Sequence, residues 1–348
     1  MKIIRDYTYL NQTDKGACVA IGNFDGVHKG HLSVIELARE AAKNLNAPFG
    51  VITFEPHPRS YFQSNAKPFR LMNAEARASQ LAKVGINNLY ELQFNSALSS
   101  LSAKKFIEDV LVNGLGVKHI VVGEDFCFGK GRTGTVETLI HYGKQFNYGV
   151  TIAPLVADEK GVFSSTSIRN AISDGRPNDA AHMLGHWYRI EGPVISGDQR
   201  GRELGYPTAN MSLDGLHLPK FGVYTVIADI LSGPYKGRFF GAASLGERPT
   251  FGVNIPNLET YIFDFSGDIY GEELSIALVS FQRPELKFDS LDKLIEQMDQ
   301  DCKESQSILS ETYLYKSYPK EFCSYFFKST SPFSLKPYKP LSILTNQS

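Results

Sequence analysis

The sequence has few cysteines, no excess of either charge and no long hydrophobic run, and each absence excludes a class of protein. The four cysteines, Cys18, Cys127, Cys302 and Cys323, are widely separated and form no CxxC pair. We therefore expect free thiols rather than a disulfide framework or a zinc cluster. Lys and Arg number 36 against 37 Asp and Glu, which gives a net charge of −1. This balance predicts neither a nucleic-acid nor a membrane partner.

No segment approaches the roughly 18 consecutive apolar residues of a membrane-spanning helix, and the first residues lack the apolar core of a signal peptide. These absences favour a cytoplasmic protein. Hydrophobic residues make up 42% and charged residues 21%, with a mean hydropathy of −0.20, as in an ordinary globular protein. A chain of 348 residues exceeds the size at which one core keeps growing, so we expect more than one domain.

The first half of the chain alternates short β-branched runs with amphipathic stretches, which is typical of a parallel sheet with crossover helices. We expect strands at residues 18–21, 49–54 and 119–122, and helices at 32–42, 74–84 and 103–112. The sequence therefore predicts a Rossmann-like α/β domain over residues 1–185. Because ligands of such sheets bind at the carboxyl ends of the strands, the residues after Ile21, Phe54 and Val122 are the places to search for a site.

The second half changes character after Trp187, the only tryptophan. Strand-like runs recur between Gly and Pro turns, which favours a small antiparallel β-barrel. We expect strands at residues 188–190, 223–230, 239–244, 260–265 and 274–281, followed by a helix at 290–309. This second domain covers residues 186–309. Residues 310–348, rich in Tyr, Phe, Ser, Lys and Pro, form an extension without an assigned structure or role.

The first motif follows the strand at residues 18–21 and contains His28 and His31. Gly22 and Gly26 allow the backbone to approach a ligand closely, and the start of the next helix offers free N–H groups to an anion. Two histidines three residues apart can both donate hydrogen bonds to phosphate oxygens. A random HxxH pair is more often capping or exposed. The position of His28 and His31 in a Gly-rich turn between a strand and a helix favours a nucleotide-phosphate site.

Three further segments lie where a site would form. Pro56-His57-Pro58 follows the second strand, where two prolines make a rigid wall beside His57. The GEDFCFG segment follows the third strand and contains Asp125. Residues 164–169 open a helix, so hydroxyls, N–H groups and Arg169 converge on a phosphate. Each segment alone is explained equally well by a turn or a helix cap.

Together and in this order, these segments resemble the adenylyltransferase module of bacterial bifunctional riboflavin kinase/FAD synthetases. The histidines of that nucleotidyltransferase superfamily contact the phosphates of ATP. The resemblance implies that the phosphate of FMN attacks the α-phosphorus of ATP, with Mg²⁺ present and pyrophosphate leaving. It assigns catalysis to His28, His31 and Arg169, ATP binding to Gly22, Phe24, Asp25, Gly26, Ser165 and Thr166, and flavin binding to Pro56, His57, Pro58 and Asp125.

The second motif is the Gly- and Arg-rich stretch at residues 192–210. Its glycines and arginines can wrap a polyphosphate with N–H groups and guanidinium groups. Thr208 and Asn210 lie two residues apart on an extended chain, so both side chains can reach one Mg²⁺ ion. An isolated turn of this composition is more often a surface hairpin.

The full order of residues, however, closely resembles the flavokinase signature. That resemblance implies ATP-dependent phosphorylation of riboflavin to FMN. It assigns ATP binding to Gly197, Arg200, Gly201 and Gly205, the metal to Thr208 and Asn210, the general base to Glu259, and flavin binding to Arg283. Glu259 taken alone is also consistent with a solvent-facing strand residue.

Three positions depart from the family pattern. Cys127 and Thr135 replace an expected Arg and Asp, and Ser244 stands where Asn is frequent. These departures bear on flavin affinity more than on the type of reaction. Two rival functions remain open at this point: a riboflavin kinase whose first half is inactive, and a non-catalytic flavin- or nucleotide-binding regulator. The sequence does not decide the oligomeric state, and small-molecule substrates are the only partners that it predicts.

Overall fold

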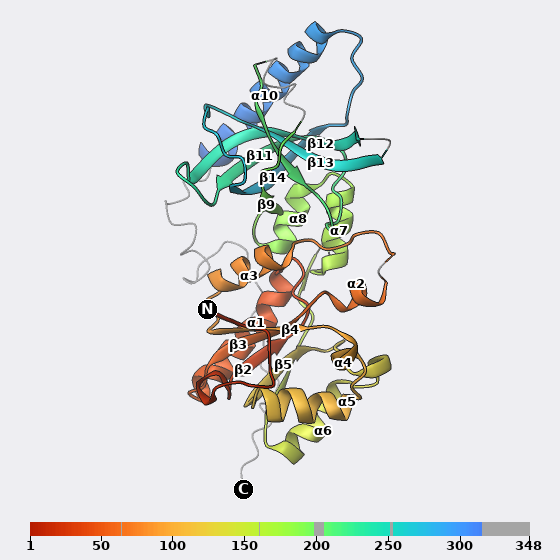
Figure 1. Cartoon of the computed structure of the whole chain (residues 1–348). Helices are drawn as coiled ribbons and strands as arrows, with labels where there is room; N and C mark the ends of the chain where they lie inside the picture. The colour runs from red at the N-terminus through yellow and green to blue at the C-terminus, as the bar shows by residue number, and fades with distance from the viewer. Residues whose placement is uncertain (64, 160, 198–204, 251–252, 315–348) are drawn as a thin grey trace. The chain divides into compact units, whose positions relative to one another are not determined.

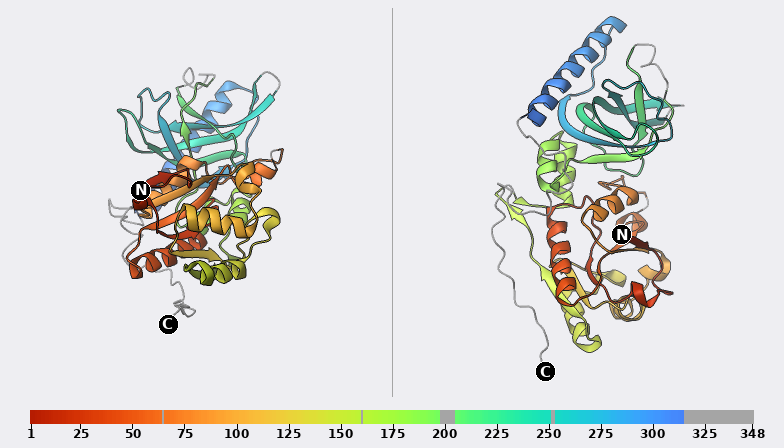
Figure 2. Two further views of the ribbon diagram at one scale, coloured as in Figure 1. Left: turned by 60° about the horizontal axis from the view of Figure 1, so that its bottom comes forward. Right: turned by 90° about the vertical axis from the view of Figure 1, so that its left-hand side faces the viewer.

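The computed structural model describes residues 1–63, 65–159, 161–197, 205–250 and 253–314 (Figures 1 and 2). These residues divide into two compact units. The first unit comprises Met1–Ala66 and Arg77–Phe163, and the second comprises Lys67–Ala76 and the described chain from Ser164 to Leu314. Each unit has its own hydrophobic core, so each can be understood by itself. The domain limits at residues 185 and 309 stay a prediction.

The sheet of the first unit is parallel, with the strand order β1-β4-β3-β2-β5-β6. From β2 the chain adds β3 and β4 on one side and then crosses to β5 and β6 on the other. The carboxyl ends of β2 and β5 therefore form a topological switch point, where ligands of open α/β sheets bind. This sheet confirms the predicted Rossmann-like fold. The strands are β1 Lys2–Ile4, β2 Cys18–Ile21, β3 Phe49–Glu55, β4 Asn88–Gln93, β5 His119–Gly123 and β6 Gly149–Ala153.

Helices cover both faces of this sheet because alternate strand residues point to opposite sides. Helix α1 (Lys29–Asn44) packs on β2, β3 and β5 and buries Ile35 and Ala38. Val19 and Ile21 of β2 belong to a core that includes Phe106 and Ile107 of the π-helix η2. The other elements are η1 Gln12–Asp14, α2 Pro58–Phe62, α3 Ala74–Lys83, α4 Ser96–Ser99, α5 Ala103–Lys105, η2 Phe106–Gly114, η3 Lys130–Arg132, α6 Val136–Phe146 and the hairpin β7 Ala157–Asp158 with β8 Gly161–Val162.

The sheet of the second unit is antiparallel, with the order β10-β13-β12-β11-β14-β9. A bridge between Ile195 and Asn210 brings the segment after β9 against β10, so the sheet is nearly closed. This confirms the predicted barrel. Helix α10, blue in Figure 1, packs on β11 and β12. The elements are α7 Ser165–Ser173, α8 Pro177–Leu184, β9 Arg189–Pro193, β10 Thr208–Ser212, β11 Gly222–Ile230, β12 Gly237–Thr250, β13 Val253–Ile262, β14 Glu273–Arg283 and α10 Leu291–Leu314.

Several predicted elements have different limits in the structure, and two of them differ for a clear physical reason. The strand expected at residues 260–265 ends at Ile262, because Asp264 turns the chain with a left-handed φ of 55°. That strand begins earlier, before Pro256. Pro256 pairs with β12 on one side of the strand. On the other side it lies outside the residues that pair with β10, so its missing N–H breaks no bond there. The helix expected at 103–112 is a short α-helix that continues as η2. Among the described residues, no helix is long and apolar enough to cross a bilayer.

Candidate functional site

The turn between β2 and α1 is shaped by residues with left-handed backbone angles. Phe24, Gly26 and Val27 have φ values of 51°, 91° and 45°, which glycine adopts freely and other residues only when the surroundings hold them there. The Gly22 N–H donates a hydrogen bond to the Ile52 carbonyl at 3.1 Å. The turn is therefore fixed at the carboxyl ends of β2 and β3, beside the switch point of the sheet.

His28 and His31 stack on each other at the start of α1, with ring centroids 3.6 Å apart and 19° between the planes. Nδ1 of His28 accepts the backbone N–H of His31 at 3.2 Å and caps the helix. Phe24 packs against the His31 ring at 5.2 Å. Burial, with a smaller contribution from His28, lowers the pKa of His31 well below its usual value. The His31 ring is therefore neutral at pH 7 and can donate one N–H bond.

The remaining residues of this turn are closely packed. Asp25 is buried. A Cβ atom on Gly30 would lie 3.0 Å from the carbonyl oxygen of Phe163, so this position has room for little more than glycine. The ammonium group of Lys29 lies 5.4 Å from the centre of the Phe163 ring. The glycine between the two histidines thus allows the close approach of the chain at Phe163.

The Pro56-His57-Pro58 segment leads from β3 into α2. The Glu55–Pro56 peptide bond is cis, and Nδ1 of His57 accepts the Arg59 N–H at 3.0 Å as the helix cap. The structure adds three rings at this place that the sequence analysis did not identify. Tyr61, Phe62 and Phe94 contact one another with centroids 5.2 to 5.7 Å apart. Phe62 is 67% exposed, a large apolar surface beside the predicted flavin-binding residues.

The segment after β5 carries Asp125 with an exposed side chain. Phe126 and Phe128, the sequence neighbours of the half-buried Cys127, stack on each other with ring centroids 5.7 Å apart. Thr135, a departure from the family pattern, has a structural role at the start of α6: its N–H donates to Oγ1 of Thr138 at 3.2 Å, and its hydroxyl donates to Glu137 at 2.6 Å. Nothing in the structure explains Cys127.

Helix α7 of the second unit begins with the predicted phosphate-binding residues. Ser164 caps the helix by accepting the Ser167 N–H at 3.1 Å, and Ser165 and Thr166 form the first turn. Nη1 of Arg169 donates to the Phe69 carbonyl at 3.3 Å, with the guanidinium 5.7 Å above the Phe69 ring. That these residues hold the same ATP as the two histidines stays a prediction.

The predicted kinase residues meet on neighbouring strands of the barrel. Asn210 on β10 is in register with Glu259 on β13. Nδ2 of Asn257 donates to Oδ1 of Asn210 at 2.9 Å and to Oε1 of Glu259 at 3.4 Å. Thr208 is half-buried two residues before Asn210. The sequence analysis missed Asn257, whose position two residues before Glu259 on the same face of a strand was the only available signal.

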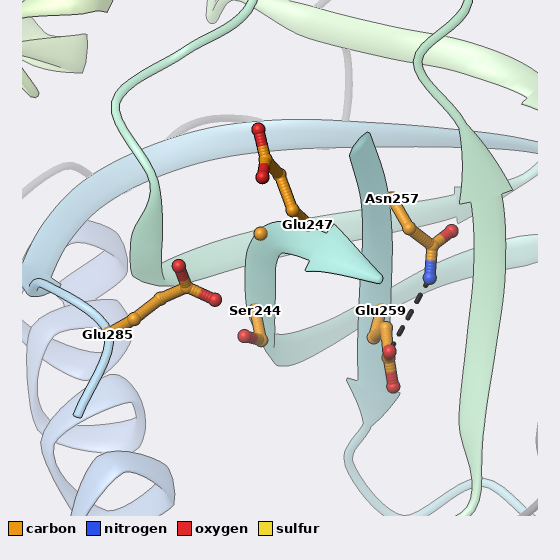
Figure 3. Close-up of a pocket in the computed structure, with 6 residues that line it drawn as sticks. Ser244, Glu247, Asn257, Glu259 and Glu285 are labelled. Carbon is orange, nitrogen blue, oxygen red and sulfur yellow. Dashed lines mark hydrogen bonds between the residues drawn. The ribbon is translucent and has the colours of Figure 1, made fainter. Parts of the chain in front are cut away.

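Asn257 and Glu259 of this group line a polar pocket (Figure 3). Ser244, the third departure from the family pattern, is in register with Glu259 and lines the same pocket. Glu285 lies close to Gly246, and Glu247 lines the pocket as well. Three carboxylates therefore surround one opening, a surface that favours a cation and polar hydroxyl groups over an apolar ligand.

Gly197 lies against the Asn210 side chain, and this contact gives a test of the kinase site. A Cβ atom at Gly197 would overlap the Asn210 amide nitrogen and lie 2.7 Å from its Cγ. We expect Gly197→Ala to displace Asn210 and to lower the rate of FMN formation roughly 10- to 100-fold, since a shift of about 1 Å can cost about 100-fold.

Gly192→Ala is the matched control, because its Cβ would meet only the Met211 methyl group at 4.0 Å. Both rates are measured with riboflavin and ATP. Equal rates for the two variants would contradict a role for the Asn210 position.

Other predicted residues have different surroundings. Arg283 makes a bidentate ion pair with Asp301 of α10, at 2.8 and 2.6 Å, so its flavin-binding role stays a prediction. Gly205 has a left-handed φ of 84°, as expected for a tight turn. Arg200 and Gly201 lie outside the described residues.

A second pocket of the barrel unit was missed by the sequence analysis. Tyr206 lies just after Gly205, its hydroxyl donates to Asp299 of α10, and its ring meets Tyr261 edge-on at 5.0 Å. Burial raises the pKa of Cys302 to about 11, so its thiol stays protonated. The pocket is lined by Tyr206, Tyr261, Phe263, Asp264, Asp299, Cys302, Lys303 and Gln306. Its aromatic walls suit a planar ring.

The fold and the two sites define a class: an ATP-using transferase with a Rossmann-like unit and a barrel unit. Comparison with family models agrees with this class in both halves. Residues 10–167 match the FAD synthetase family, and residues 184–309 match the Riboflavin kinase family.

Relatives that contain both halves specify the family. A bifunctional riboflavin kinase/FMN adenylyltransferase of Pseudomonas fluorescens is 38% identical over 84% of this chain and 93% of its own length. One of Haemophilus influenzae is 36% identical over 89% of this chain and 100% of its own length. The chain therefore belongs to the bifunctional riboflavin kinase/FMN adenylyltransferase family, which makes flavin cofactors from riboflavin and ATP.

A solved structure supports the same fold. A crystal structure from Streptococcus pneumoniae, described as that of a macrolide-efflux protein, is 35% identical with a TM-score of 0.76. The match covers 87% of this chain and 98% of the other. The efflux description belongs to the Streptococcus protein and says nothing about the chemistry of this chain.

Proposed function

We propose that Glu259 is the general base that activates riboflavin in the second unit. The 5′-hydroxyl oxygen of riboflavin attacks the γ-phosphorus of ATP, its proton passes to the Glu259 carboxylate, and ADP leaves. The observation that carries this proposal is the Asn257 amide, which reaches both Glu259 and Asn210. A carboxylate oriented by a buried amide is held ready for proton transfer, because it need not reorganise when the substrate binds.

We also propose that Thr208 and Asn210 hold Mg²⁺. Hydroxyl, amide and carboxylate oxygens are the ligands that Mg²⁺ takes in proteins, and these side chains lie on β10 next to Glu259. When bound, the ion would neutralise negative charge on the phosphate oxygens of ATP. The described residues contain no cluster of three or more His, Cys, Asp or Glu side chains that could hold a metal.

In the first unit, we propose that the phosphate of FMN attacks the α-phosphorus of ATP and that pyrophosphate leaves. His28 and His31 donate hydrogen bonds to the phosphate oxygens of ATP, and the N–H groups at the start of α1 add positive potential. The family resemblance also assigns Arg169, Ser165 and Thr166 of α7, in the second unit, to the binding of ATP phosphates. The reaction needs no nucleophilic side chain, because FMN itself supplies the attacking oxygen.

We further propose that FMN lies against Pro56-His57-Pro58, with Asp125 and the exposed Phe62 ring at its isoalloxazine. Stacking of an aromatic ring on a nucleobase contributes about 1 to 3 kcal/mol, and the flavin ring is a comparable planar surface. We expect Phe62→Ala to raise the KM for FMN in FAD formation roughly tenfold and to leave the KM for ATP unchanged.

Tyr9→Ala serves as the matched control, since Tyr9 is a 92% exposed aromatic residue of the same unit. In both variants the KM for FMN is measured with FMN as the varied substrate, and the KM for ATP with ATP as the varied substrate. A KM for FMN that Phe62→Ala leaves at the wild-type value would remove Phe62 from the flavin site.

A product assay tests the proposal as a whole. Purified protein receives riboflavin, ATP and Mg²⁺, and FMN, FAD, ADP and pyrophosphate are quantified. We expect FMN to appear first and FAD to follow, with the activity lost in EDTA. FMN without FAD would favour the rival in which the first half is inactive. We expect small molecules to be the only substrates and the cytoplasm to be the location, as the sequence predicts.

A further inference from the structure

The carboxyl ends of β3 and β4 carry an ion-pair network centred on Arg77 of α3. The Arg77 side chain is 0% exposed, and its Nη2 atom lies 2.9 Å from Oε2 of Glu55 and 3.0 Å from Oε2 of Glu91. The Glu91 side chain is only 4% exposed and also accepts a hydrogen bond from Arg5 at 3.0 Å. A single cationic group thus joins the last residue of β3 to a buried carboxylate of β4.

Stability alone is a poor explanation of this network. Removing charges from water costs free energy, and apolar residues of the same size often replace a buried ion pair without loss of stability. Moreover, Nε and Nη1 of Arg77 are buried without a hydrogen-bond partner among the described residues. An arginine placed here at such a cost is better explained by what it holds in position.

The network holds the end of β3 through the side chain of Glu55. Glu55 is the last residue of that strand and directly precedes Pro56, and its carbonyl accepts the Phe94 N–H at 2.9 Å. Two residues earlier, Thr53 is in register with Glu91, is fully buried, and donates to the Asn23 carbonyl at 3.2 Å. The strand end is therefore tied to Arg77 through Glu55 and to the phosphate-binding turn through Thr53.

We propose that Arg77 is a positioning residue for FMN in adenylyl transfer. By bridging Glu55 and Glu91, it fixes the point from which Pro56-His57-Pro58 and the Phe62 ring extend. FMN then binds to a preorganised surface, and less of its binding free energy is used to order the segment from Pro56 to Phe62. This inference rests on the proposed FMN site of the first unit and assigns a residue to it that no motif contains.

The test is the KM for FMN in FAD formation by the full-length enzyme. We expect Arg77→Met to raise this KM at least tenfold, with kcat and the KM for ATP within about threefold of wild type. We expect Arg77→Lys to restore the KM for FMN, because both ion pairs use the same nitrogen, which an ammonium group can replace. A purely structural role would instead lower the amount of active enzyme and leave both KM values unchanged.

Two controls separate positioning from a general loss of structure. Arg39→Met removes an ion-paired arginine that lies 4.7 Å above the ring of Phe49, at the opposite end of β3. We expect it to leave the KM for FMN unchanged. Riboflavin kinase activity of the second unit reports on folding of the same chain. If Arg77→Met does not fold, Glu55→Gln provides the same test, because it removes the charge at the strand end and keeps the shape.

The outcomes distinguish this inference from the proposed function. A wild-type enzyme that forms no FAD from FMN and ATP would overturn both. A wild-type enzyme that forms FAD, together with an unchanged KM for FMN in Arg77→Met or Glu55→Gln, would overturn the inference alone. An equal rise of the KM for FMN in Arg39→Met would overturn it as well, because the effect would then not depend on the end of the strand that carries Glu55.

Discussion

Replacing Glu259 by glutamine should reduce the formation of FMN from riboflavin by roughly 1,000-fold, while the formation of FAD from added FMN continues at the wild-type rate. General-base catalysis contributes about 10²- to 10⁴-fold, and glutamine keeps the shape of the side chain while it cannot accept the proton. The Asn257 amide can still donate to the glutamine oxygen, as it does to Glu259 at 3.4 Å. The loss should therefore fall on kcat, with the KM for riboflavin nearly unchanged.

The matched control is Glu285→Gln, which neutralises another carboxylate of the same pocket. FMN is quantified by chromatography in both variants, and FAD formation from FMN is measured in the same preparations. We expect Glu285→Gln to retain most of the kinase rate. If it loses the kinase rate while Glu259→Gln keeps it, Glu285 rather than Glu259 is the base.

Replacing His31 by alanine should have the opposite effect. The rate of FAD formation from FMN should fall roughly 100- to 1,000-fold, the usual loss when a donor to developing charge is removed, and riboflavin phosphorylation should continue. The physical reason is that His31 offers a neutral donor at the start of α1, because burial keeps its pKa well below the usual value. Removing the ring also removes the stacking partner of His28.

His141→Ala is the control, because His141 is an exposed histidine of the same unit, on α6. His31→Asn retains a donor of similar reach and should recover part of the rate. FAD and pyrophosphate are measured with FMN and ATP as substrates. A variant without His31 that adenylylates FMN at the wild-type rate would falsify the role assigned to this histidine.

The two variants together test whether the activities reside in separate sites. Glu259 belongs to the barrel unit and His31 to the Rossmann-like unit. We expect a mixture of the two inactive variants to convert riboflavin to FAD, because FMN released by one protein can be adenylylated by the other. The reciprocal pattern of losses also excludes a general folding defect as the cause of either loss.

The fold class could be predicted from the sequence because hydrophobic periodicity is a local property. The buried runs at Cys18–Ile21 and His119–Gly123 are apolar enough to be recognised without any tertiary contact. Strand β4 was not predicted, because it contains Asn88 and Glu91 among its buried residues. Glu91 is buried with two cationic partners that are distant in the sequence, Arg77 and Arg5.

The motifs predicted which residues carry the chemistry, and their neighbours followed from the tertiary structure. The segments at residues 22–31 and 208–210 are short, so the sequence alone gives the order of their side chains. Asn257 joins this set only because β10 and β13 pair in the register that places Asn210 beside Glu259. The rings of Tyr61, Phe62 and Phe94 meet because α2 folds back on the residue that follows β4.

The sequence by itself determined the class of each unit from local patterns and, through its resemblance to a known family, the two reactions. The residues assigned to those reactions stay a prediction. The tertiary structure decided which side chains lie next to one another: the amide beside the proposed base, the exposed ring beside the proline pair and the buried arginine at the end of β3. Such contacts join residues that are distant along the chain. They are set by strand register and helix packing, which no short segment of sequence specifies.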